Sequence, residues 1–349
     1  MGMEVDFLLI GQGLAGTALC HRILESGKRV MVFDLPEANK SSRVAAGLYN
    51  PVTGKKMVRT WLADQLFPEI EPFYSSLEQL LGKTFLMKRP IYRPFLTVEE
   101  QNEWMGHSGD PFIQPFFEKI YTQPLFEEVK NPFGGIFLKN SGYLDINTLL
   151  DAYSAFLLEK GCLRQEHLKE DELRFEKDGV FYQDIKAGTV IYCNGLGALE
   201  SDFFKELPFA PVKGEILDLE QDFHPDAIIN RGVFRISLPN GLKRVGSTYS
   251  WHDLDTGPTE RAKKEILEKL DKLVNVGAPK VIDHKFGIRP ATKDRKPFLG
   301  KHPVKERVYI FNGFGAKGVS LVPYFSKVML ELLIQGKEPQ KEVNIMRCM

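Results

Sequence analysis

The stretch VDFLLIGQGLAGTALCHRILESGKRVMVFD, at residues 5–34, decides the fold. It starts with an apolar run from Val5 to Ile10, which is typical of a buried parallel strand. A helical pattern follows from Leu14 to Glu25, and a second apolar run extends from Arg29 to Phe33. The succession of strand, glycine turn, helix and strand predicts a βαβ unit.

The turn between the first strand and the helix reads Gly11-Gln12-Gly13-Leu14-Ala15-Gly16, which fits G-x-G-x-x-G in its proper context. Gly11 permits the tight turn, and Gly13 lets a pyrophosphate approach the backbone. Gly16 lets the helix pack closely on the strand. The alternative is a tight strand–helix connection without a ligand.

The residues around this turn complete a candidate dinucleotide site. Leu14 and Ala15 open the helix, whose free N–H groups and positive dipole end favour phosphate. Asp34 closes the second strand and would accept hydrogen bonds from ribose hydroxyls. An acid there favours FAD or NAD over NADP, whose 2′-phosphate it would repel. The motif alone does not separate FAD from NAD.

The composition is that of a globular protein. Of the 349 residues, 43% are hydrophobic and 26% are charged, which excludes wholesale disorder. Lys+Arg and Asp+Glu both number 46, so the chain has no general attraction for nucleic acid or an anionic membrane, although a local basic patch stays open. The sequence does not give the oligomeric state, and a homo-oligomer is compatible with it.

The cysteines and the N-terminus indicate the compartment. Cys20, Cys162, Cys193 and Cys348 are scattered without metal-binding spacing, so we expect free thiols in a reducing compartment and no metal. The chain starts without the basic region of a signal peptide, and no stretch approaches the roughly 18 apolar residues that cross a bilayer. We expect a cytoplasmic protein without a membrane partner.

The rest of the chain alternates between nucleotide-domain patterns and β-rich segments. Residues 85–142 are rich in proline and aromatic residues, which is typical of β-rich or irregular structure. Expected helices cover 61–81, 147–160, 260–274 and 319–334, and expected strands cover 189–193, 213–219, 233–249 and 308–311, the third folded at a hairpin over 239–241. This alternation predicts a discontinuous chain of two domains.

Five further segments carry a family resemblance. They are Ser41-Ser42-Arg43-Val44-Ala45-Ala46-Gly47-Leu48, Pro211-Val212-Lys213-Gly214-Glu215, Gly246-Ser247-Thr248-Tyr249, Gly287-Ile288-Arg289-Pro290-Ala291-Thr292-Lys293-Asp294 with Pro297-Phe298-Leu299-Gly300, and Gly313-Phe314-Gly315-Ala316-Lys317-Gly318-Val319. In this order and spacing they resemble the D-amino acid oxidase superfamily of flavoproteins, especially its glycine oxidase and sarcosine oxidase branch. The resemblance covers nearly the whole chain and implies FAD as the cofactor.

The resemblance also implies a fold. We expect an α/β protein in which a Rossmann-type FAD-binding domain is interleaved with a β-rich (α+β) substrate domain. The FAD-binding domain would comprise residues 1–80, 143–207 and 285–349. The substrate domain would comprise residues 81–142 and 208–284.

A second resemblance gives an alternative function. Gly47-Leu48-Tyr49-Asn50-Pro51, followed by the predicted helix from Trp61 to Tyr74, is similar to the flavin domain of the bifunctional enzyme that modifies wobble uridines in tRNA. It would act on a carboxymethylaminomethyl-uridine, with tRNA as the partner. Zero net charge and the lack of a long Lys/Arg run argue against that partner.

Two segments are implied to hold the cofactor together with the glycine turn. Hydroxyls of the first segment would donate to phosphates while its small residues lie against the flavin ring. The glycine loop before the last helix would direct N–H groups at the flavin's pyrimidine edge, where negative charge builds on reduction. The residues concerned are Ser41, Ser42, Ala45, Ala46 and Gly47 in the first segment, Gly313, Gly315, Ala316, Lys317, Gly318 and Val319 in the second, and Gly195 after the strand at 189–193. The alternatives are a serine-rich loop and a solvated surface lysine.

The candidate substrate residues come from the same resemblance. The arginine of the G-x-R-P motif, Arg289, would form a planar fork with the substrate's carboxylate, and its alternative is a structural pair with Asp294. Phe234 stands where glycine oxidases carry a substrate-contacting tyrosine, which puts glycine itself in doubt. Tyr249 and Tyr49 are further pocket candidates, as is Trp251, each with core or rim packing as its alternative.

These residues predict an FAD-dependent enzyme that oxidises the C–N bond of a small amino acid or N-substituted glycine. The resemblance implies hydride transfer to flavin, which needs a neutral amine and close alignment rather than a side-chain base. Besides the tRNA alternative, a hydroxy-acid dehydrogenase of the same fold remains open. No cysteine lies between Arg289 and the last glycine loop, where sarcosine oxidases attach FAD, so we expect noncovalent FAD.

Overall fold

The computed structural model describes residues 2–35, 40–54, 58–254 and 256–348. The helices are α1 (Leu14–Glu25), α2 (Ser41–Val44), α3 (Ala63–Leu81), α4 (Val98–His107), α5 (Ile146–Glu159), α6 (Glu260–Asp271) and α7 (Gly318–Gln335). The strands are β1 (Met3–Ile10), β2 (Val30–Phe33), β3 (Leu48–Tyr49), β4 (Val52–Thr53), β5 (Val58–Arg59), β6 (Leu86–Lys88), β7 (Ile91–Pro94), β8 (Phe117–Tyr121), β9 (Gly135–Leu138), β10 (Gly142–Leu144), β11 (Leu163–Arg164), β12 (Arg174–Glu176), β13 (Gly179–Tyr182), β14 (Ile185–Tyr192), β15 (Val212–Glu220), β16 (Ile228–Arg231), β17 (Val233–Ser237), β18 (Lys243–Gly246), β19 (Lys280–Arg289), β20 (Phe298–Lys301) and β21 (Val308–Asn312).

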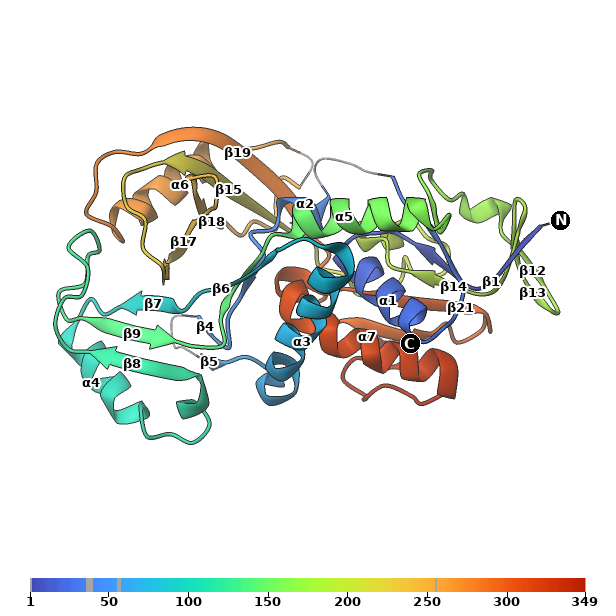
Figure 1. Cartoon of the computed structure of the whole chain (residues 1–349), viewed down its shortest axis with the longest axis horizontal. Coiled ribbons are helices and arrows are strands. Elements are labelled where there is room, and N and C mark those ends of the chain that lie inside the picture. Colours follow the sequence, from blue (N-terminus) through green and yellow to red (C-terminus); the bar gives the residue numbers. More distant parts are fainter. Residues whose placement is uncertain (1, 36–39, 55–57, 255, 349) are drawn as a thin grey trace.

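The molecule is elongated, and its two lobes are each built on a large sheet (Figure 1). The first sheet has the order β11-β2-β1-β14-β13-β12, with β21 pairing parallel to β14 and β20 antiparallel to β21. Strands from the start, middle and end of the chain therefore lie side by side. The predicted βαβ unit is confirmed, because β1 and β2 pair in parallel on either side of α1 in sequence.

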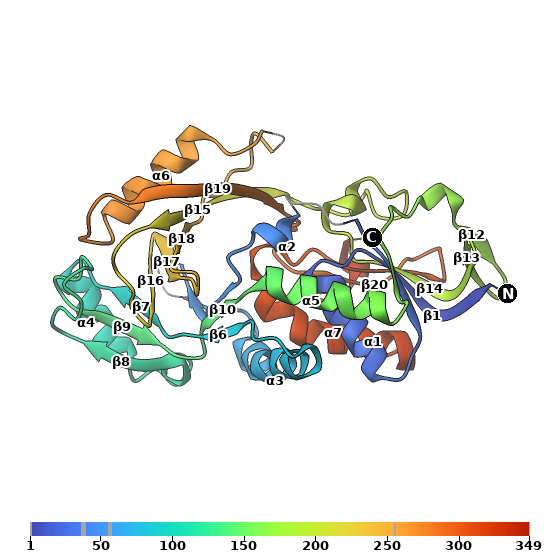
Figure 2. The ribbon, with the colours of Figure 1, turned by 45° about the horizontal axis from the view of Figure 1, so that its top comes forward.

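Both faces of this first sheet are buried, which explains the continuous apolar run of β1. Phe7 and Leu9 face a core shared with α1, α5 and α7. Leu8 and Ile10 face the opposite core, which includes Tyr182 of β13. Helix α1 packs against α7, so the first and last helices of the chain are neighbours (Figure 2).

The second sheet has the order β19-β15-β18-β17-β16-β7-β9-β8. One face packs on α6, whose Ile266 and Leu270 join Leu217 and Val245 in a separate core. The long strands β15 and β19 run from this lobe to the middle of the molecule (Figure 2). The other face of the sheet is turned toward the first lobe, where the candidate site lies.

Most predicted elements are present with bounds shifted by a few residues, and the hairpin between β17 and β18 is confirmed. The prediction for residues 85–142 was incomplete, because this segment also contains α4. The Thr97 side chain caps that helix by accepting a hydrogen bond from Glu100 N at 3.2 Å. Strand β19 was not predicted. The domain boundaries stay a prediction.

Among the residues that the structure describes, no helix is both long and apolar enough to cross a bilayer. No group of His, Cys, Asp and Glu side chains in the same described ranges could hold a metal ion.

Candidate cofactor and substrate site

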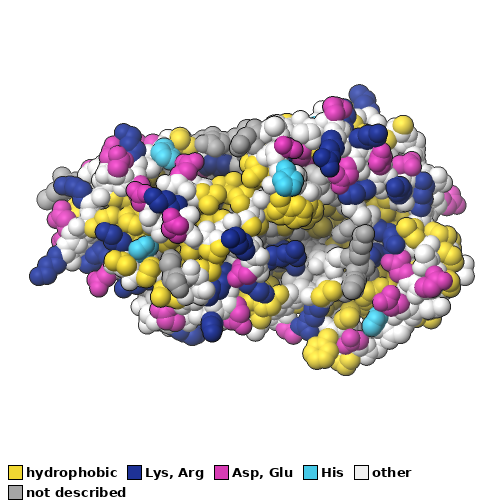
Figure 3. Space-filling model, turned by 180° about the vertical axis from the view of Figure 1, so that it is seen from behind, with side chains coloured by type: hydrophobic (Ala, Val, Ile, Leu, Met, Phe, Trp, Pro, Cys, Tyr) yellow, Lys and Arg dark blue, Asp and Glu magenta, His cyan; other side chains and the backbone are white. Residues whose placement is uncertain are grey.

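A cavity of about 2040 Å³ lies between the two lobes. Its walls include the β1–α1 turn, α2, the loop after β14, the N-terminal end of α7 and the inner face of the second sheet. The space-filling view shows a hollow near the middle of one face with Lys and Arg side chains beside it (Figure 3). The cavity is about twice the upper end of ordinary ligand pockets, about 1,000 Å³, so it has room for a large ligand and a second molecule.

The glycine turn has the geometry that its motif predicts. Gly11 has φ +99°, and a Cβ there would lie 2.8 Å from the carbonyl oxygen of Cys193, so only glycine fits. A Cβ on Gly16 would overlap the carbonyl oxygen of Gly11. Gly16 therefore lets α1 pack on β1 and is not in the cavity wall, whereas Gly11 and Gly13 are.

Asp34 lies at the end of β2 beside this turn. Its Oδ1 accepts hydrogen bonds from Gln12 N at 2.9 Å and from Lys40 Nζ at 2.6 Å. Among the described residues Oδ2 has no such partner, and Asp34 lines the cavity. The carboxylate is therefore held in place with one oxygen left for ribose hydroxyls.

The segment from Ser41 begins with the short helix α2 rather than the loop considered as an alternative. The hydroxyl of Ser42 accepts a hydrogen bond from Leu14 N at 3.1 Å, which places it at the N-terminal end of α1 where a phosphate would bind. A Cβ on Gly47 would overlap Leu144 O, so this segment runs directly against β10. Ser41, Ser42, Ala45, Ala46 and Gly47 all line the cavity.

The second glycine loop faces the same cavity from the other end of the chain. Gly313 and Gly315 have positive φ, +78° and +54°, and lead into α7. Asn312 Nδ2 donates to Gly195 O at 2.8 Å, which joins this loop to the one after β14. Gly195, Gly313, Gly315, Ala316, Lys317, Gly318 and Val319 all line the cavity.

Lys317 lines the cavity rather than the outer surface considered as its alternative. Its Nζ lies 3.4 Å from Thr60 Oγ1. Desolvation, and to a smaller extent the nearby Arg295, lowers the pKa of Lys317. Two helix N-termini, a fixed carboxylate and this cation thus surround one cavity, and this donor set fits a dinucleotide that accepts negative charge at one end.

Arg289 ends β19 at the inner end of the second sheet. Its Nη2 donates to Ser247 Oγ at 2.8 Å, and its guanidinium carbon lies 4.4 Å from the centre of the Tyr249 ring. The alternative pair with Asp294 is wrong, because that carboxylate accepts from Arg347 Nε at 2.8 Å. Burial lowers the pKa of Arg289, as expected for a cation held away from water.

Gly214 makes room for this guanidinium. It lies on β15, which pairs with β19, and Val212 of β15 stands opposite Arg289. A Cβ on Gly214 would overlap Nη2 of Arg289, so the guanidinium lies across the glycine. Gly214 of the Lys213-Gly214-Glu215 segment thus leaves space for the Arg289 guanidinium, a role that the sequence alone did not indicate.

The two charged neighbours of Gly214 hold the segment that carries Tyr249 and Trp251. Lys213 Nζ donates to Thr256 O and Gly257 O, both at 2.7 Å. The backbone N–H of Glu215 donates to Thr248 Oγ1 at 3.0 Å, and its carboxylate accepts from Thr259 N at 2.8 Å. The Lys213 and Glu215 side chains are both buried, so these contacts from β15 hold the segment that carries Tyr249 and Trp251 in place.

The predicted aromatic residues divide into two groups. Phe234 and Tyr249 line the cavity, as does Trp251. The prediction for Tyr49 was wrong, because its side chain is buried in the core and is not in the cavity wall. Side chains alternate along a strand, and on β3 Leu48 faces the cavity while Tyr49 points the other way.

Sequence reasoning missed a charged wall on the second lobe. Arg93, Glu100, Asn230 and Arg231 line the cavity from β7, α4 and β16. No local sequence motif could have predicted this wall, because Glu100 and Arg231 are separated by 131 positions in the sequence.

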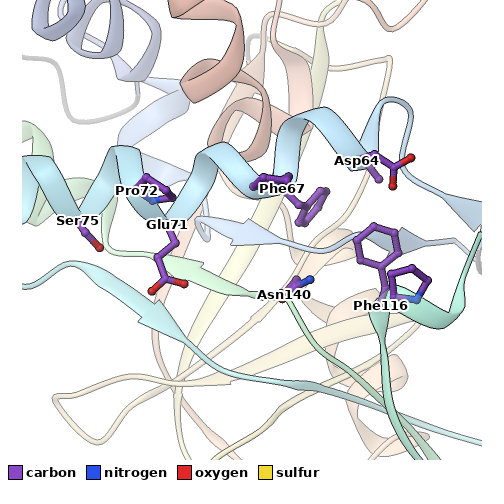
Figure 4. Close-up of a pocket in the computed structure, with 10 residues that line it drawn as sticks. Asp64, Phe67, Glu71, Pro72, Ser75, Phe116 and Asn140 are labelled. Carbon is purple, nitrogen blue, oxygen red and sulfur yellow. The ribbon is translucent and has the colours of Figure 1, made fainter.

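A second hollow of about 680 Å³ lies on the outer side of α3. Figure 4 shows Phe67 and Phe116 facing it, with Asp64 and Glu71 on the helix above. Glu71 is paired with Lys88 at 2.5 Å and Asp64 with Arg59. None of the described residues that line this hollow is a glycine, and its two charged residues, Asp64 and Glu71, are both acidic, so we do not assign the cofactor to it.

The cysteines give the first testable prediction, which is that FAD is bound noncovalently. Cys193 lines the cavity beside the glycine turn, but burial raises the pKa of its thiol far above the ordinary value. Cys20 is buried and lies outside the cavity wall. We therefore expect acid precipitation to leave the yellow colour in the supernatant, as read by absorbance. Colour retained in the washed pellet would contradict this.

Comparison with known proteins identifies the class. Residues 6–332 match the family model described as FAD dependent oxidoreductase, which is nearly the whole chain. The chain therefore belongs to this family of FAD-dependent oxidoreductases, and FAD is the ligand that the dinucleotide site fits.

Several curated relatives are similar to the chain. Glycine oxidase of Bacillus subtilis is 28% identical over 228 residues, which cover 61% of this chain and 58% of that enzyme. Glycine oxidase of Bacillus licheniformis is 20% identical over 96% of this chain and 94% of that enzyme. The tRNA 5-methylaminomethyl-2-thiouridine biosynthesis bifunctional protein MnmC of Leptospira interrogans is 23% identical over 95% of this chain and 58% of that protein. The matched regions thus span less than two thirds of some of these relatives.

Solved structures support the fold. Glycine oxidase from Geobacillus kaustophilus superimposes with a TM-score of 0.79 at 18% identity, covering 97% of this chain and 96% of that one. Iminodiacetate oxidase from Chelativorans sp. BNC1 superimposes with a TM-score of 0.76 at 20% identity, covering 96% of each. The predicted α/β fold with a Rossmann-type FAD-binding part and a second domain is confirmed.

Proposed function

We propose that this protein oxidises the C–N bond of a small amino acid or N-substituted glycine. Bound FAD would supply the acceptor for the hydride that leaves the carbon beside the amine. The observation that carries the proposal is Arg289, whose guanidinium lines the cavity and is not paired with a carboxylate of the described residues.

The surroundings of Arg289 suit the carboxylate of such a substrate. Ser247 and the Tyr249 ring orient the guanidinium. The planar guanidinium can donate two N–H groups to a substrate carboxylate. Burial strengthens this ion pair because water screens it less. A carboxylate fixed there leaves the neighbouring carbon and its amine as the reacting part of the substrate.

Phe234 supports a substrate other than glycine. It lines the cavity on β17, in a row of cross-strand neighbours with Ile216, Gly246 and Asn230. Ile216 and Phe234 offer apolar contact and no hydroxyl. An N-substituent or side chain on the substrate would gain from that contact, whereas glycine has neither.

A second candidate function is oxidation of the carboxymethylaminomethyl group of a tRNA uridine. Tyr249 and Trp251 are 57% and 59% exposed at the cavity, where bases could stack on them. Lys293, Arg295 and Lys296 also line it, which gives the net-neutral chain a local group of cations. The similarity of the chain to the MnmC protein of Leptospira interrogans also supports this candidate.

One substrate panel tests these functions. Stopped-flow absorbance would follow reduction of the bound flavin by sarcosine, D-alanine, proline, glycine, lactate and tRNA that carries the carboxymethylaminomethyl group. We expect N-substituted or side-chain-bearing amino acids to reduce the flavin faster than glycine. Reduction by the tRNA alone, with affinity that falls steeply as salt rises, would replace the first proposal by the second. Reduction by lactate alone would contradict both.

A further inference from the structure

The cavity continues well beyond Arg289 along the inner face of the second sheet. Cross-strand register places Ile216, Gly246, Phe234 and Asn230 in one row, and all four line the cavity. Arg231 ends β16 next to this row. The sheet thus forms one continuous wall from Arg289 on β19 to the cluster on β16 and β7.

This wall is longer than a small amino acid. From β19 to β16 the sheet crosses four strand spacings, roughly 19 Å between backbones at about 4.8 Å each. One extended residue spans only about 3.3–3.6 Å. An amino acid whose carboxylate is held by Arg289 therefore leaves the far end of the wall free for another part of the same substrate.

The far end carries two guanidinium groups and one carboxylate. Arg231 Nη1 lies 2.5 Å and 2.6 Å from the two carboxylate oxygens of Glu100 and also donates to Pro94 O at 3.0 Å. Arg93 Nη2 lies 3.6 Å from Oε1 of the same carboxylate. One negative charge is thus shared by two positive charges, and these three described side chains together carry a net charge of +1.

Glu100 is fixed by its own helix as well. It stands at the third position of α4, and its Oε2 accepts from Leu96 N at 3.2 Å while its N–H donates to Thr97 Oγ1. Because the carboxylate bonds back to the residue before the N-cap, it stays at the helix start. All hydrogen bonds of Arg231 among the described residues are donated by Nη1, and its side chain is 24% exposed. Its remaining N–H groups are available to a ligand in the cavity.

We propose that Arg231 and Arg93 form a second anion subsite, which binds a carboxylate or phosphate at the far end of the substrate from the reacting amine. The substrate class is then an amino acid or N-substituted glycine with a remote anionic group. The inference rests on the proposed function, because Arg289 defines the near end. Asn230 lines the cavity next to Arg231 on β16, and its side-chain amide can donate a further hydrogen bond.

The mutual repulsion of the cluster supports this assignment. Burial lowers the pKa of Arg93, and the Arg231 charge lowers it further, while Glu100 raises it. An added anion would relieve that repulsion. A planar guanidinium also matches carboxylate and phosphate geometry better than an ammonium group does.

Isothermal titration calorimetry of the purified protein tests the subsite with defined probes. The probes are α,ω-dicarboxylates from malonate to dodecanedioate, the monocarboxylates of equal chain length, and ω-phosphonocarboxylates of the same lengths. We expect one or two adjacent lengths at which the dicarboxylate binds roughly 10- to 100-fold tighter than its monocarboxylate. The comparison at equal length removes the contribution of the apolar chain. Whether the phosphonate or carboxylate series binds more tightly identifies the remote group.

Two variants with opposite expected effects test whether the preference for dicarboxylates arises at the Arg231 cluster. Arg231→Gln should abolish the preference for dicarboxylates and leave monocarboxylate affinity unchanged. Glu100→Gln should increase the preference, because the cluster then carries +2, and glutamine can still cap α4. Arg174→Gln is the matched control, since Arg174 is exposed on β12 outside the cavity and should change nothing.

The two ideas fail in different ways. A dicarboxylate preference that is absent at every length, or that survives in Arg231→Gln, overturns the subsite. A colourless protein that takes up no FAD, or a flavin that neither a panel compound nor an amino acid with a remote carboxylate, such as D-glutamate, reduces, overturns the proposed function. Calorimetry does not depend on flavin colour, so the first result is read independently of the second.

Discussion

Replacing Arg289 with alanine is expected to lower kcat/KM for carboxylate substrates by about 100- to 1,000-fold, the usual cost of truncating one partner of a buried charge pair. The guanidinium holds the substrate's carboxylate, and its loss leaves that anion in a desolvated cavity without a partner. Steady-state kinetics on the best substrate of the panel measures the change. The visible spectrum of bound FAD should be unchanged, because Arg289 is assigned to substrate and not to cofactor.

Arg289→Lys separates charge from shape. Lysine keeps the positive charge but lacks the planar pair of N–H donors and cannot reproduce the contact with Ser247 and Tyr249 in the same orientation. We expect activity between those of wild type and Arg289→Ala, with the larger change in KM. An alanine variant with wild-type kcat/KM would remove Arg289 from the site.

Gly214→Ala is expected to lower kcat/KM by roughly 10- to 100-fold, although it adds only one methyl group. That methyl would overlap Nη2 of Arg289, so the guanidinium must leave its position above β15. The backbone of Gly214 does not have positive φ, and alanine is therefore tolerated by the strand itself. The measurement is kcat/KM beside the melting temperature, since the expected loss is one of activity more than of stability.

Gly106→Ala is the matched control for this substitution. Gly106 lies in α4 with nothing within 4 Å of an added Cβ, so alanine should stabilise the helix by up to about 1 kcal/mol and leave activity unchanged. If Gly214→Ala behaves like Gly106→Ala, the close approach of Arg289 to Gly214 has no bearing on substrate binding.

The parts of the fold that sequence predicted are those with local periodicity. The β1–α1–β2 unit and the long helices each bury one face, so their apolar residues recur at fixed spacing. Helix α4 was missed because Trp104 is its one fully buried residue, so it has no repeated apolar spacing. Strand β19 was missed because it lies at the edge of its sheet and only Gly287 is fully buried, so polar and apolar residues do not alternate along it.

In the candidate site, too, the residues that belong to a local sequence motif were predicted, and those that meet only through long-range pairing were missed. The glycine turn and Asp34 are defined by neighbours in sequence, and they line the cavity as expected. Tyr49 failed because one step along β3 reverses the direction of a side chain, which a motif match does not resolve. Arg231 and Glu100 meet only when β16 pairs with β7, a long-range event that no local pattern encodes.

The order of the strands has a consequence for biosynthesis. Strand β21 completes the first sheet beside β14, and the loop after it supplies the last wall of the dinucleotide site. A ribosome must therefore translate the chain through the loop between β21 and α7 before the nucleotide can be enclosed. We therefore expect cofactor uptake to follow synthesis of α7, and a nascent chain that stalls before α7 to be released without the cofactor.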